Sequence, residues 1–349
     1  MNRALRLHTK YVYGGLTFCL VVLAGVSGYF YGQYIQKNNY ATFIKSFRNI
    51  RENTDKYDFI NPLIGGASAP ATDVGIYLDL KESIIDSLSE DEHKGNLYSY
   101  SLYFRDLGTG FWFGIDESDN FSPASLFKLP ISIATYKQGE DDPSFLKKEV
   151  VYTEEISKMN SSVKSNSESG LVIGKSYSVE DLVEIMITQS DNGAKDLLLT
   201  VIDKSYLNKL FALVALADPQ TSSVYQISAV KYALFLRVLY GASYLNNDNS
   251  ERILGYLAKS TFGDGLVAGL PKNIPVAHKF GVYEFDGTVN GIITHVQQLH
   301  DCGVIYHAKK PYILCIMTKG KDLPSLYTVI AKASKLIYED QERNNHETQ

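Results

Sequence analysis

The stretch Pro123–Lys137, PASLFKLPISIATYK, places a serine directly before a run of mostly apolar residues. This run predicts a buried helix from about Ser125 to Lys137. At the N-terminus of such a helix, the dipole and the free backbone N–H groups favour a developing negative charge on a substrate. Lys128 follows one turn later in an apolar setting, which lowers the pKa of an amine. Ser125 and Lys128 are therefore a candidate nucleophile and its base.

The spacing S-x-x-K carries little weight by itself, because it occurs four times in the chain. The other three copies are Ser144/Lys147, Ser161/Lys164 and Ser228/Lys231. They lie in polar or charged surroundings, or in a segment with no predicted helix start at the serine. Context therefore favours the pair at Ser125.

A second candidate group of polar residues is Ser-Asp-Asn, which occurs twice in the chain. Ser190-Asp191-Asn192 ends an amphipathic helix predicted over 179–189, where a hydroxyl and an amide can face a cleft. A second Ser-Asp-Asn, at 118–120, lies in a polar loop. Each copy alone reads equally well as a helix cap or a turn.

Lys279-Phe280-Gly281 lies in the predicted strand VAHKFGVY. A glycine inside such a strand allows a substrate to approach the backbone. Taken alone, Lys279 reads equally well as a surface charge at a strand end.

The order of the three groups is more specific than any one of them. Ser125 of S-x-x-K is followed by S-D-N 65 residues later (190 − 125) and by K-x-G 154 residues later (279 − 125). This order resembles the active-site-serine penicillin-recognising superfamily, and most closely the class A β-lactamases, over roughly residues 75–340. The resemblance implies a β-lactamase-like α/β (α+β) fold: an antiparallel sheet from both chain ends, flanked by helices, plus a helical subdomain.

The resemblance also implies roles in a reaction that needs no cofactor and no metal. Ser125 would attack an amide carbonyl and form an acyl-enzyme, and Lys128 would take its proton. Ser190 would pass a proton to the departing nitrogen, helped by Lys279.

Further positions would bind the substrate. Asn192 would hydrogen-bond the substrate's side-chain amide, whereas Asp191 would brace the loop. The backbone N–H groups of Ser125 and Val282, which follows Gly281, would form an oxyanion hole.

The chain departs from the class A pattern in its carboxylates. Class A β-lactamases carry a glutamate after S-D-N that activates the deacylating water, but the only glutamate between Asn192 and Lys279 is Glu251. Glu251 lies at the predicted start of another helix. Asp218 is a candidate substitute in the segment where the glutamate is expected. Acylation is therefore expected to persist while deacylation is slow.

The second departure is Phe280, where the family usually has threonine or serine to help hold a substrate carboxylate. No arginine follows until Arg343, so Lys279 is the nearest remaining cation. Recognition of a substrate carboxylate is therefore in doubt.

The N-terminus predicts a membrane anchor. Tyr11–Tyr31 is an uncharged stretch of 21 residues, long enough to span a bilayer as a helix. Three basic residues precede it, so residues 1–10 are expected in the cytoplasm and the catalytic domain on the outer face of the cell membrane. A cleaved signal peptide is the alternative, because Ala24 and Gly25 are small enough for a cleavage site.

The remaining chain divides into a stalk over 32–72, a catalytic domain over 73–340 and a polar tail over 341–349. Within the domain, one apolar helical face is predicted from about Val74. Strands are predicted over 97–106, 111–115, 275–283, 299–306 and 312–318, with an apolar-faced helix closing the domain.

Composition excludes some other functions. The net charge of −5 gives no basic surface for nucleic acid, and His295, His300 and His307 match no common metal spacing. Pairing about a turn at 307–311 places Cys302 and Cys315 on opposite faces of a hairpin, which predicts two buried thiols rather than a disulfide.

Three functions remain. The first is a membrane-anchored class A β-lactamase-type hydrolase that opens a β-lactam or a related amide. The second is a D-Ala-D-Ala peptidase or penicillin-binding protein that acts on peptidoglycan stem peptides. The third is a non-enzymatic binding domain on the same fold, supported mainly by Phe280.

Overall fold

The computed structural model describes residues 22–29, 31, 50–51, 56–65, 77–161, 169–214, 216, 225–289, 291–308 and 310–346. The chain divides into two compact units, residues 1–48 and residues 49–349. In the first unit, residues 22–29 and 31 are helical. The rest of the predicted anchor, residues 11–21 and 30, lies outside the described residues. Within the described ranges, no helix combines the length and the apolar character needed to cross a membrane.

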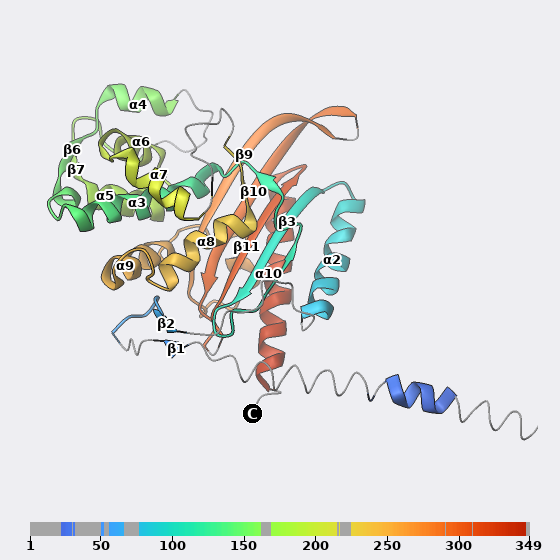
Figure 1. The fold of residues 1–349 in the computed structure, drawn as a ribbon. Helices are drawn as coiled ribbons and strands as arrows, with labels where there is room; N and C mark the ends of the chain where they lie inside the picture. The colour runs from blue at the N-terminus through green and yellow to red at the C-terminus, as the bar shows by residue number, and fades with distance from the viewer. Residues whose placement is uncertain are drawn as a thin grey trace, which may run out of the picture. The chain divides into compact units, whose positions relative to one another are not determined.

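The second unit is built on a five-stranded antiparallel sheet from both chain ends, as predicted (Figure 1). The strand order is β4 (Trp112–Ile115), β3 (Leu97–Asp106), β11 (Tyr312–Gly320), β10 (Ile292–Ile305) and β9 (Val276–Val289). β9 is therefore an edge strand, and it carries the predicted K-x-G group. β9 and β10 are longer than the predicted strands. Residues 292–296 of β10 extend beyond β11 and pair with β9 alone.

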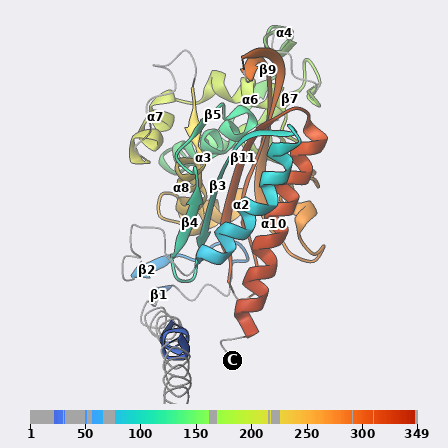
Figure 2. The same cartoon turned by 90° about the vertical axis from the view of Figure 1, so that its right-hand side faces the viewer.

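Two helices cover one face of this sheet, where Figure 2 shows them side by side. α2 (Leu78–His93) buries Leu80, Ile84 and Leu88, the face predicted from the apolar spacing. α10 (Leu323–His346) is the predicted closing helix, and it extends into the range predicted as a polar tail. Burying these apolar stripes against the sheet contributes roughly 1.5–3 kcal/mol per large side chain.

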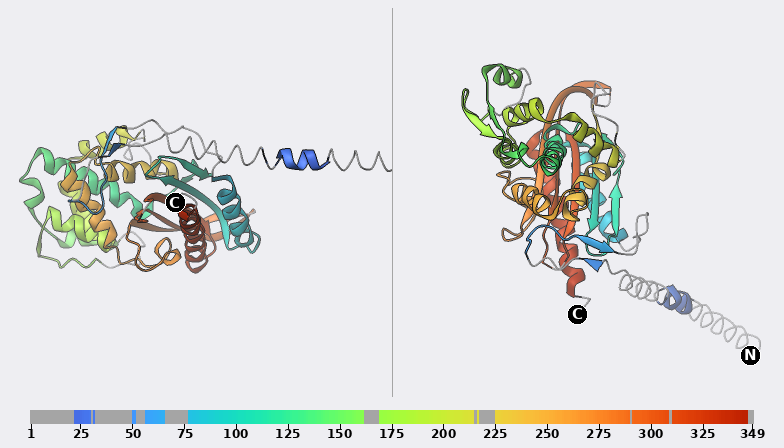
Figure 3. Two further views of the ribbon diagram at one scale, coloured as in Figure 1. Left: turned by 90° about the horizontal axis from the view of Figure 1, so that it is seen from below. Right: turned by 60° about the vertical axis from the view of Figure 1, so that its left-hand side comes forward.

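Most of the other helices cluster on the opposite side, in green to gold in Figure 3, whereas the short η4 (Val267–Gly269) packs against α10. Besides η4, they are η2 (Ala124–Phe127), α3 (Lys128–Asp141), η3 (Phe145–Lys147), α4 (Glu154–Ser161), α5 (Val179–Thr188), α6 (Asn192–Val201), α7 (Lys204–Leu213), α8 (Ala229–Tyr240) and α9 (Asn247–Ala258). Three two-stranded pairs complete the unit: β1 (Ile50–Arg51) with β2 (Leu63–Gly65), β5 (Asn120–Phe121) with β8 (Ile227–Ser228), and β6 (Glu149–Val151) with β7 (Ser176–Ser178). Ser178 caps α5 by accepting the N–H of Asp181.

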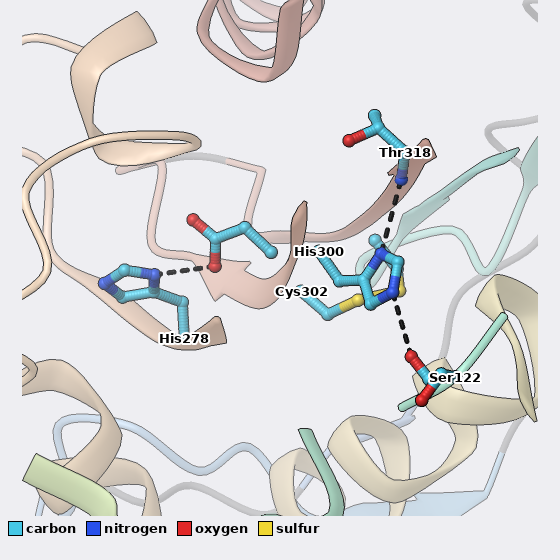
Figure 4. The surroundings of a disulfide bond; sticks show 7 residues. Ser122, His278, His300, Cys302 and Thr318 are labelled. Carbon is cyan, nitrogen blue, oxygen red and sulfur yellow. Dashed lines mark hydrogen bonds and ion pairs between the residues drawn. A yellow bond between two sulfur atoms is a disulfide. The ribbon is translucent and has the colours of Figure 1, made fainter. Parts of the chain in front are cut away.

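The two cysteines correct the prediction of free thiols, because Cys302 and Cys315 form a disulfide (Figure 4). They are direct cross-strand partners of β10 and β11. Directly opposite residues of an antiparallel pair point to the same face. The expectation failed because the connection runs from Tyr306 to Pro311, which moves the register by one residue.

Candidate active site

Ser125 lies in the turn η2, directly before α3 begins at Lys128. The Nζ of Lys128 is 3.1 Å from the Oγ of Ser125, because residues three positions apart on a helix share a face. Ala124 has a left-handed backbone, with φ of 48°. This conformation is strained for a residue other than glycine and persists where the surroundings enforce it. The turn therefore holds the serine against its neighbouring amine.

Ser190 joins this pair from the junction between α5 and α6. It also has a left-handed backbone, with φ of 56°. Lys128 donates to the carbonyl oxygen of Ser190 and lies 3.2 Å from its Oγ. Lys279 of β9 donates to the same Oγ at 2.9 Å and to the carbonyl oxygen of Phe280 at 3.1 Å. Two serines and two lysines that are distant in sequence thus form one continuous cluster.

The two lysines are almost completely buried, with exposed fractions of 1% for Lys128 and 0% for Lys279. Burial, with the positive charge of Lys279 nearby, lowers the pKa of Lys128 well below its ordinary value. Burial also lowers the pKa of Lys279 to about 7, although the negative charge of Asp301 opposes the shift. The lowered pKa favours the neutral amine of Lys128, which is the form that can accept a proton from Ser125. Because Lys279 is buried, the alternative interpretation of this lysine as a surface charge at a strand end is wrong.

Asp191 braces the loop that carries Ser190, in the role expected for it. Its carboxylate caps α6 by accepting the N–H of Ala194 at 2.8 Å. It also accepts from the Oγ of Ser169 at 2.9 Å and from the N–H of Gly170 at 2.7 Å. Asn192 is the first residue of α6 and is half-buried.

Gly281 allows β9 to approach the turn of Ser125. A Cβ at Gly281 would lie 2.9 Å from the carbonyl oxygen of Pro123 and 3.1 Å from the amide nitrogen of Ser125. No larger residue fits without moving one of the two backbones. β9 at Gly281, the residue before Val282, thus lies directly against the turn that carries Ser125.

The other S-x-x-K pairs lack this environment. The hydroxyl of Ser144 donates to Asp142 at 2.7 Å, and Lys147 is exposed. Ser228 directly precedes α8, which corrects the expectation of no helix start there, but its side chain makes no capping bond. Lys164 lies outside the described residues.

Glu251 is occupied elsewhere. Its carboxylate accepts backbone N–H groups of Asp58, Phe59 and Ile60 at 2.8 to 3.1 Å. These contacts fix residues 58–60, which fall within the predicted stalk, against α9. Asp218, the candidate substitute base, lies outside the described residues.

The packing of Phe262 against Phe280, beside the cluster, could not be predicted from the sequence. The ring of Phe280 lies over Lys279, 4.2 Å from its Nζ, and stacks on Phe262 with ring centroids 4.0 Å apart. Phe262 comes from the loop after α9, which is tied to α5 by the N–H of Thr261 and the carbonyl of Thr188 at 3.3 Å. Such a pairing across loops has no sequence spacing from which it could be predicted.

The described residues contain no cluster of His, Cys, Asp and Glu able to hold a metal ion. His278 instead contacts Asp301 at 2.8 Å, and the Nε2 of His300 contacts the carbonyl oxygen of Ser122 at 2.9 Å (Figure 4). His278 therefore links β9 to β10, and His300 links β10 to the segment before η2.

Comparison with known proteins agrees with this fold. The family model described as the beta-lactamase enzyme family matches residues 80–341, and the chain belongs to this family. No curated protein matches the sequence.

Solved structures agree in fold. PBP-A has 21% identity and a TM-score of 0.62, and the match covers 76% of this chain and 97% of that one. A β-lactamase from Xanthomonas campestris pv. campestris has 18% identity and a TM-score of 0.61, with 74% and 97% covered. A variant of the last common ancestor of Gram-negative class A β-lactamases has 21% identity and a TM-score of 0.61, with 75% and 99% covered. At these identities the likeness concerns the fold.

Proposed function

We propose that this protein is a serine hydrolase that cleaves amide bonds through an acyl-enzyme at Ser125. The observation that carries the proposal is the cluster itself, in which each side chain lies within hydrogen-bonding distance of the next. The series runs from Ser125 to Lys128, Ser190 and Lys279. Because two of its members are buried amines with lowered pKa values, the cluster is suited to proton transfer rather than to a structural ion pair.

The first step forms the bond between the Oγ of Ser125 and the substrate's carbonyl carbon. The Oγ proton passes to the neutral Nζ of Lys128, and the carbonyl electron pair moves onto oxygen, which faces the backbone N–H groups of Ser125 and Val282. When the C–N bond breaks, its electron pair stays on nitrogen. Nitrogen takes the proton of Ser190, which regains one from Lys128 across 3.2 Å. Lys128 is then neutral again.

The substrate class follows from the family. A mutant of PBP-A has been solved as an acyl-enzyme complex with penicillin G. We therefore assign a β-lactam or a related amide, such as a peptidoglycan stem peptide, to this chain.

The fate of the acyl-enzyme separates β-lactamase from penicillin-binding protein. Glu251 is held by three backbone N–H groups, which leaves it unavailable to activate water. This contact favours the second function, a D-Ala-D-Ala peptidase or penicillin-binding protein that β-lactams acylate for a long time.

The location of the protein is part of the proposal. The apolar stretch 11–31 and the preceding basic residues support a single membrane anchor with the catalytic domain outside the cytoplasm. The Cys302–Cys315 disulfide supports the same location, because disulfides persist in oxidising compartments.

The test is intact-mass spectrometry of the full chain after incubation with a fluorescent penicillin, offered as the free acid and as its methyl ester. We expect a persistent adduct on the wild type but none on Ser125→Ala. The control is Ser144→Ala, which removes the serine of an exposed S-x-x-K pair and should also keep the adduct. An adduct that disappears within seconds would identify a β-lactamase with a different water-activating group. No adduct from either form would contradict the proposed function.

A further inference from the structure

A cavity of about 350 Å³ lies between α5 and the segment that contains β7 and the residue before it. This volume is at the lower end of the range for small-molecule sites, so the cavity suits a small ligand. None of the four cluster residues lines it, although its last residue directly precedes Ser190. Most of its lining side chains are polar or charged: Lys175, Ser176, Asp181, Glu184, Thr188 and Gln189.

The two walls of the cavity are held by hydrogen bonds. The N–H of Lys175 donates to the carbonyl oxygen of Val172 at 3.1 Å, which closes the turn before β7. The hydroxyl of Tyr177, whose side chain is buried, accepts the N–H of Val172 at 2.9 Å. On the other wall, Ser178 caps α5 by accepting the N–H of Asp181 at 3.0 Å. The walls are therefore formed before a ligand arrives, which reduces the ordering cost of binding.

The charged groups at the cavity have opposite signs and do not neutralise each other. The Nζ of Lys175 lies 5.0 Å from the ring centroid of Tyr177 and forms no ion pair with a described residue. Within the described ranges, the carboxylate of Asp181 also has no cationic partner. Glu184, by contrast, pairs with Lys259 at 3.4 Å. The cavity therefore offers an ammonium on one wall and a carboxylate on the other.

This combination of charges selects the class of ligand. A simple anion would meet the carboxylates of Asp181 and Glu184, and a simple cation would meet the ammonium of Lys175. An apolar ligand would remove the hydroxyls and the amide from water without giving them partners. A ligand with both charges avoids these penalties, because its carboxylate can pair with Lys175 and its ammonium with Asp181.

We propose that the cavity between β7 and α5 binds a small zwitterion: an amino acid, or a dipeptide with both termini free. Lys175 holds its carboxylate, Asp181 holds its ammonium, and a short side chain lies against Ile185. The inference goes beyond the proposed function, because the site is separate from the cluster and needs no acyl-enzyme. A D-Ala-D-Ala peptidase would itself release a ligand of this class, D-alanine.

The experiment measures the dissociation constants of D-alanine and of L-alanyl-L-alanine from the full chain by ligand-observed NMR titration. We expect saturable binding of at least one of them on the order of 1 mM, because few ligand atoms and exposed charges limit the affinity. The amide of that ligand lacks the carboxylate, and its N-acetyl form lacks the ammonium. Each should bind about two- to fivefold more weakly, as the loss of one exposed ion pair predicts.

Two substitutions assign each charge to its partner. Lys175→Met should abolish the preference for the free carboxylate over the amide and keep the preference for the ammonium over the N-acetyl form. Asp181→Asn should have the reverse effect. Both side chains are exposed, so the fold should persist, and thermal unfolding checks this. The matched control is Lys209→Met, because Lys209 also lies over a tyrosine ring, 5.1 Å from the centroid of Tyr206, but outside the cavity.

Absence of saturable binding by both ligands would overturn the inference. So would equal affinity for the zwitterion and its two neutralised forms, or the wild-type pattern in Lys175→Met. Protein acylated at Ser125 by the fluorescent penicillin should bind the zwitterion as the untreated protein does, and loss of binding would place the ligand at the cluster instead. If no penicillin adduct forms, the proposed function fails, while Lys175→Met and Asp181→Asn still decide whether the cavity binds a zwitterion.

Discussion

The lysine cluster and the carboxylate of Glu251 are both partly or fully removed from water, yet their charges are balanced in opposite ways. Glu251 accepts N–H groups from three consecutive residues, so its negative charge is satisfied by the backbone. Lys128 and Lys279 form no ion pair with a carboxylate among the described residues and contact mainly hydroxyl and carbonyl oxygens. A buried amine without a counter-ion becomes neutral and able to take a proton, whereas a satisfied carboxylate fixes structure.

The largest expected effect comes from removing the amine of Lys128. Lys128→Met keeps the length of the side chain but cannot accept the proton of Ser125. We expect the rate of acylation to fall by about 10²–10⁴, the usual contribution of a positioned general base. Mass spectrometry of the penicillin adduct over time measures this rate.

The matched control for this change is Lys147→Met. Lys147 belongs to another S-x-x-K pair but is exposed, so its replacement should leave the rate within about twofold of the wild type, as ordinary surface changes do. If the folded Lys128→Met variant were acylated at the wild-type rate, a different group would be the base and the contrast with Glu251 would lose its basis.

The next effect concerns stability. Glu251→Ala leaves three N–H groups of residues 58–60 without their acceptor, and we expect the free energy of unfolding to fall by about 1.5–3 kcal/mol. Denaturant unfolding measures this loss. The rate of deacylation per folded molecule should not change, because the carboxylate is used for structure.

Asp248→Asn serves as the comparison for Glu251→Ala. Asp248 lies on α9, like Glu251, and pairs with Lys56. Both side chains of this pair are largely exposed, so the change should have little effect on stability. A slower deacylation in Glu251→Ala would identify Glu251 as the water-activating group and reverse the distinction drawn above.

The sequence predicts the core of the candidate site well. The apolar run after Ser125 predicts where α3 begins, and the order of the three motifs predicts that Ser190 and Lys279 lie near it. The helix after Ser125 could be predicted because helical spacing and local apolar pattern are displayed directly by a single chain. The proximity of Ser190 and Lys279 was instead implied by the resemblance to the class A β-lactamases.

Features that depend on the approach of distant segments could not be predicted. The disulfide was missed because its face depends on one residue of register in the β10–β11 connection. The stack of Phe262 on Phe280 was missed because it joins a loop to a strand edge. The use of Glu251 was missed because its partners, residues 58–60, lie almost 200 residues earlier in the chain.

The last expected effect, which appears only as the pH falls, concerns His300, a buried base with neither a carboxylate nor a role in the cluster. His300 is completely buried between the carbonyl oxygen of Ser122 and the N–H of Thr318, and burial lowers its pKa to about 3. An unfolded histidine has a pKa of about 6.5. Between these values the unfolded chain binds more protons than the folded one, so stability rises with pH.

We therefore expect the free energy of unfolding to decrease as the pH falls from about 6.5 toward 3, with His300 contributing at most about 1.4 kcal/mol per pH unit. His300→Asn should reduce this slope, whereas His295→Asn, which changes an exposed histidine of the same strand, should not. Unfolding curves at several pH values measure both slopes. Equal slopes in the wild type and His300→Asn would mean that His300 has the same protonation in the folded and unfolded protein. Burial without a neighbouring carboxylate would then not be enough to make a base neutral, and the same argument for Lys128 and Lys279 would fail.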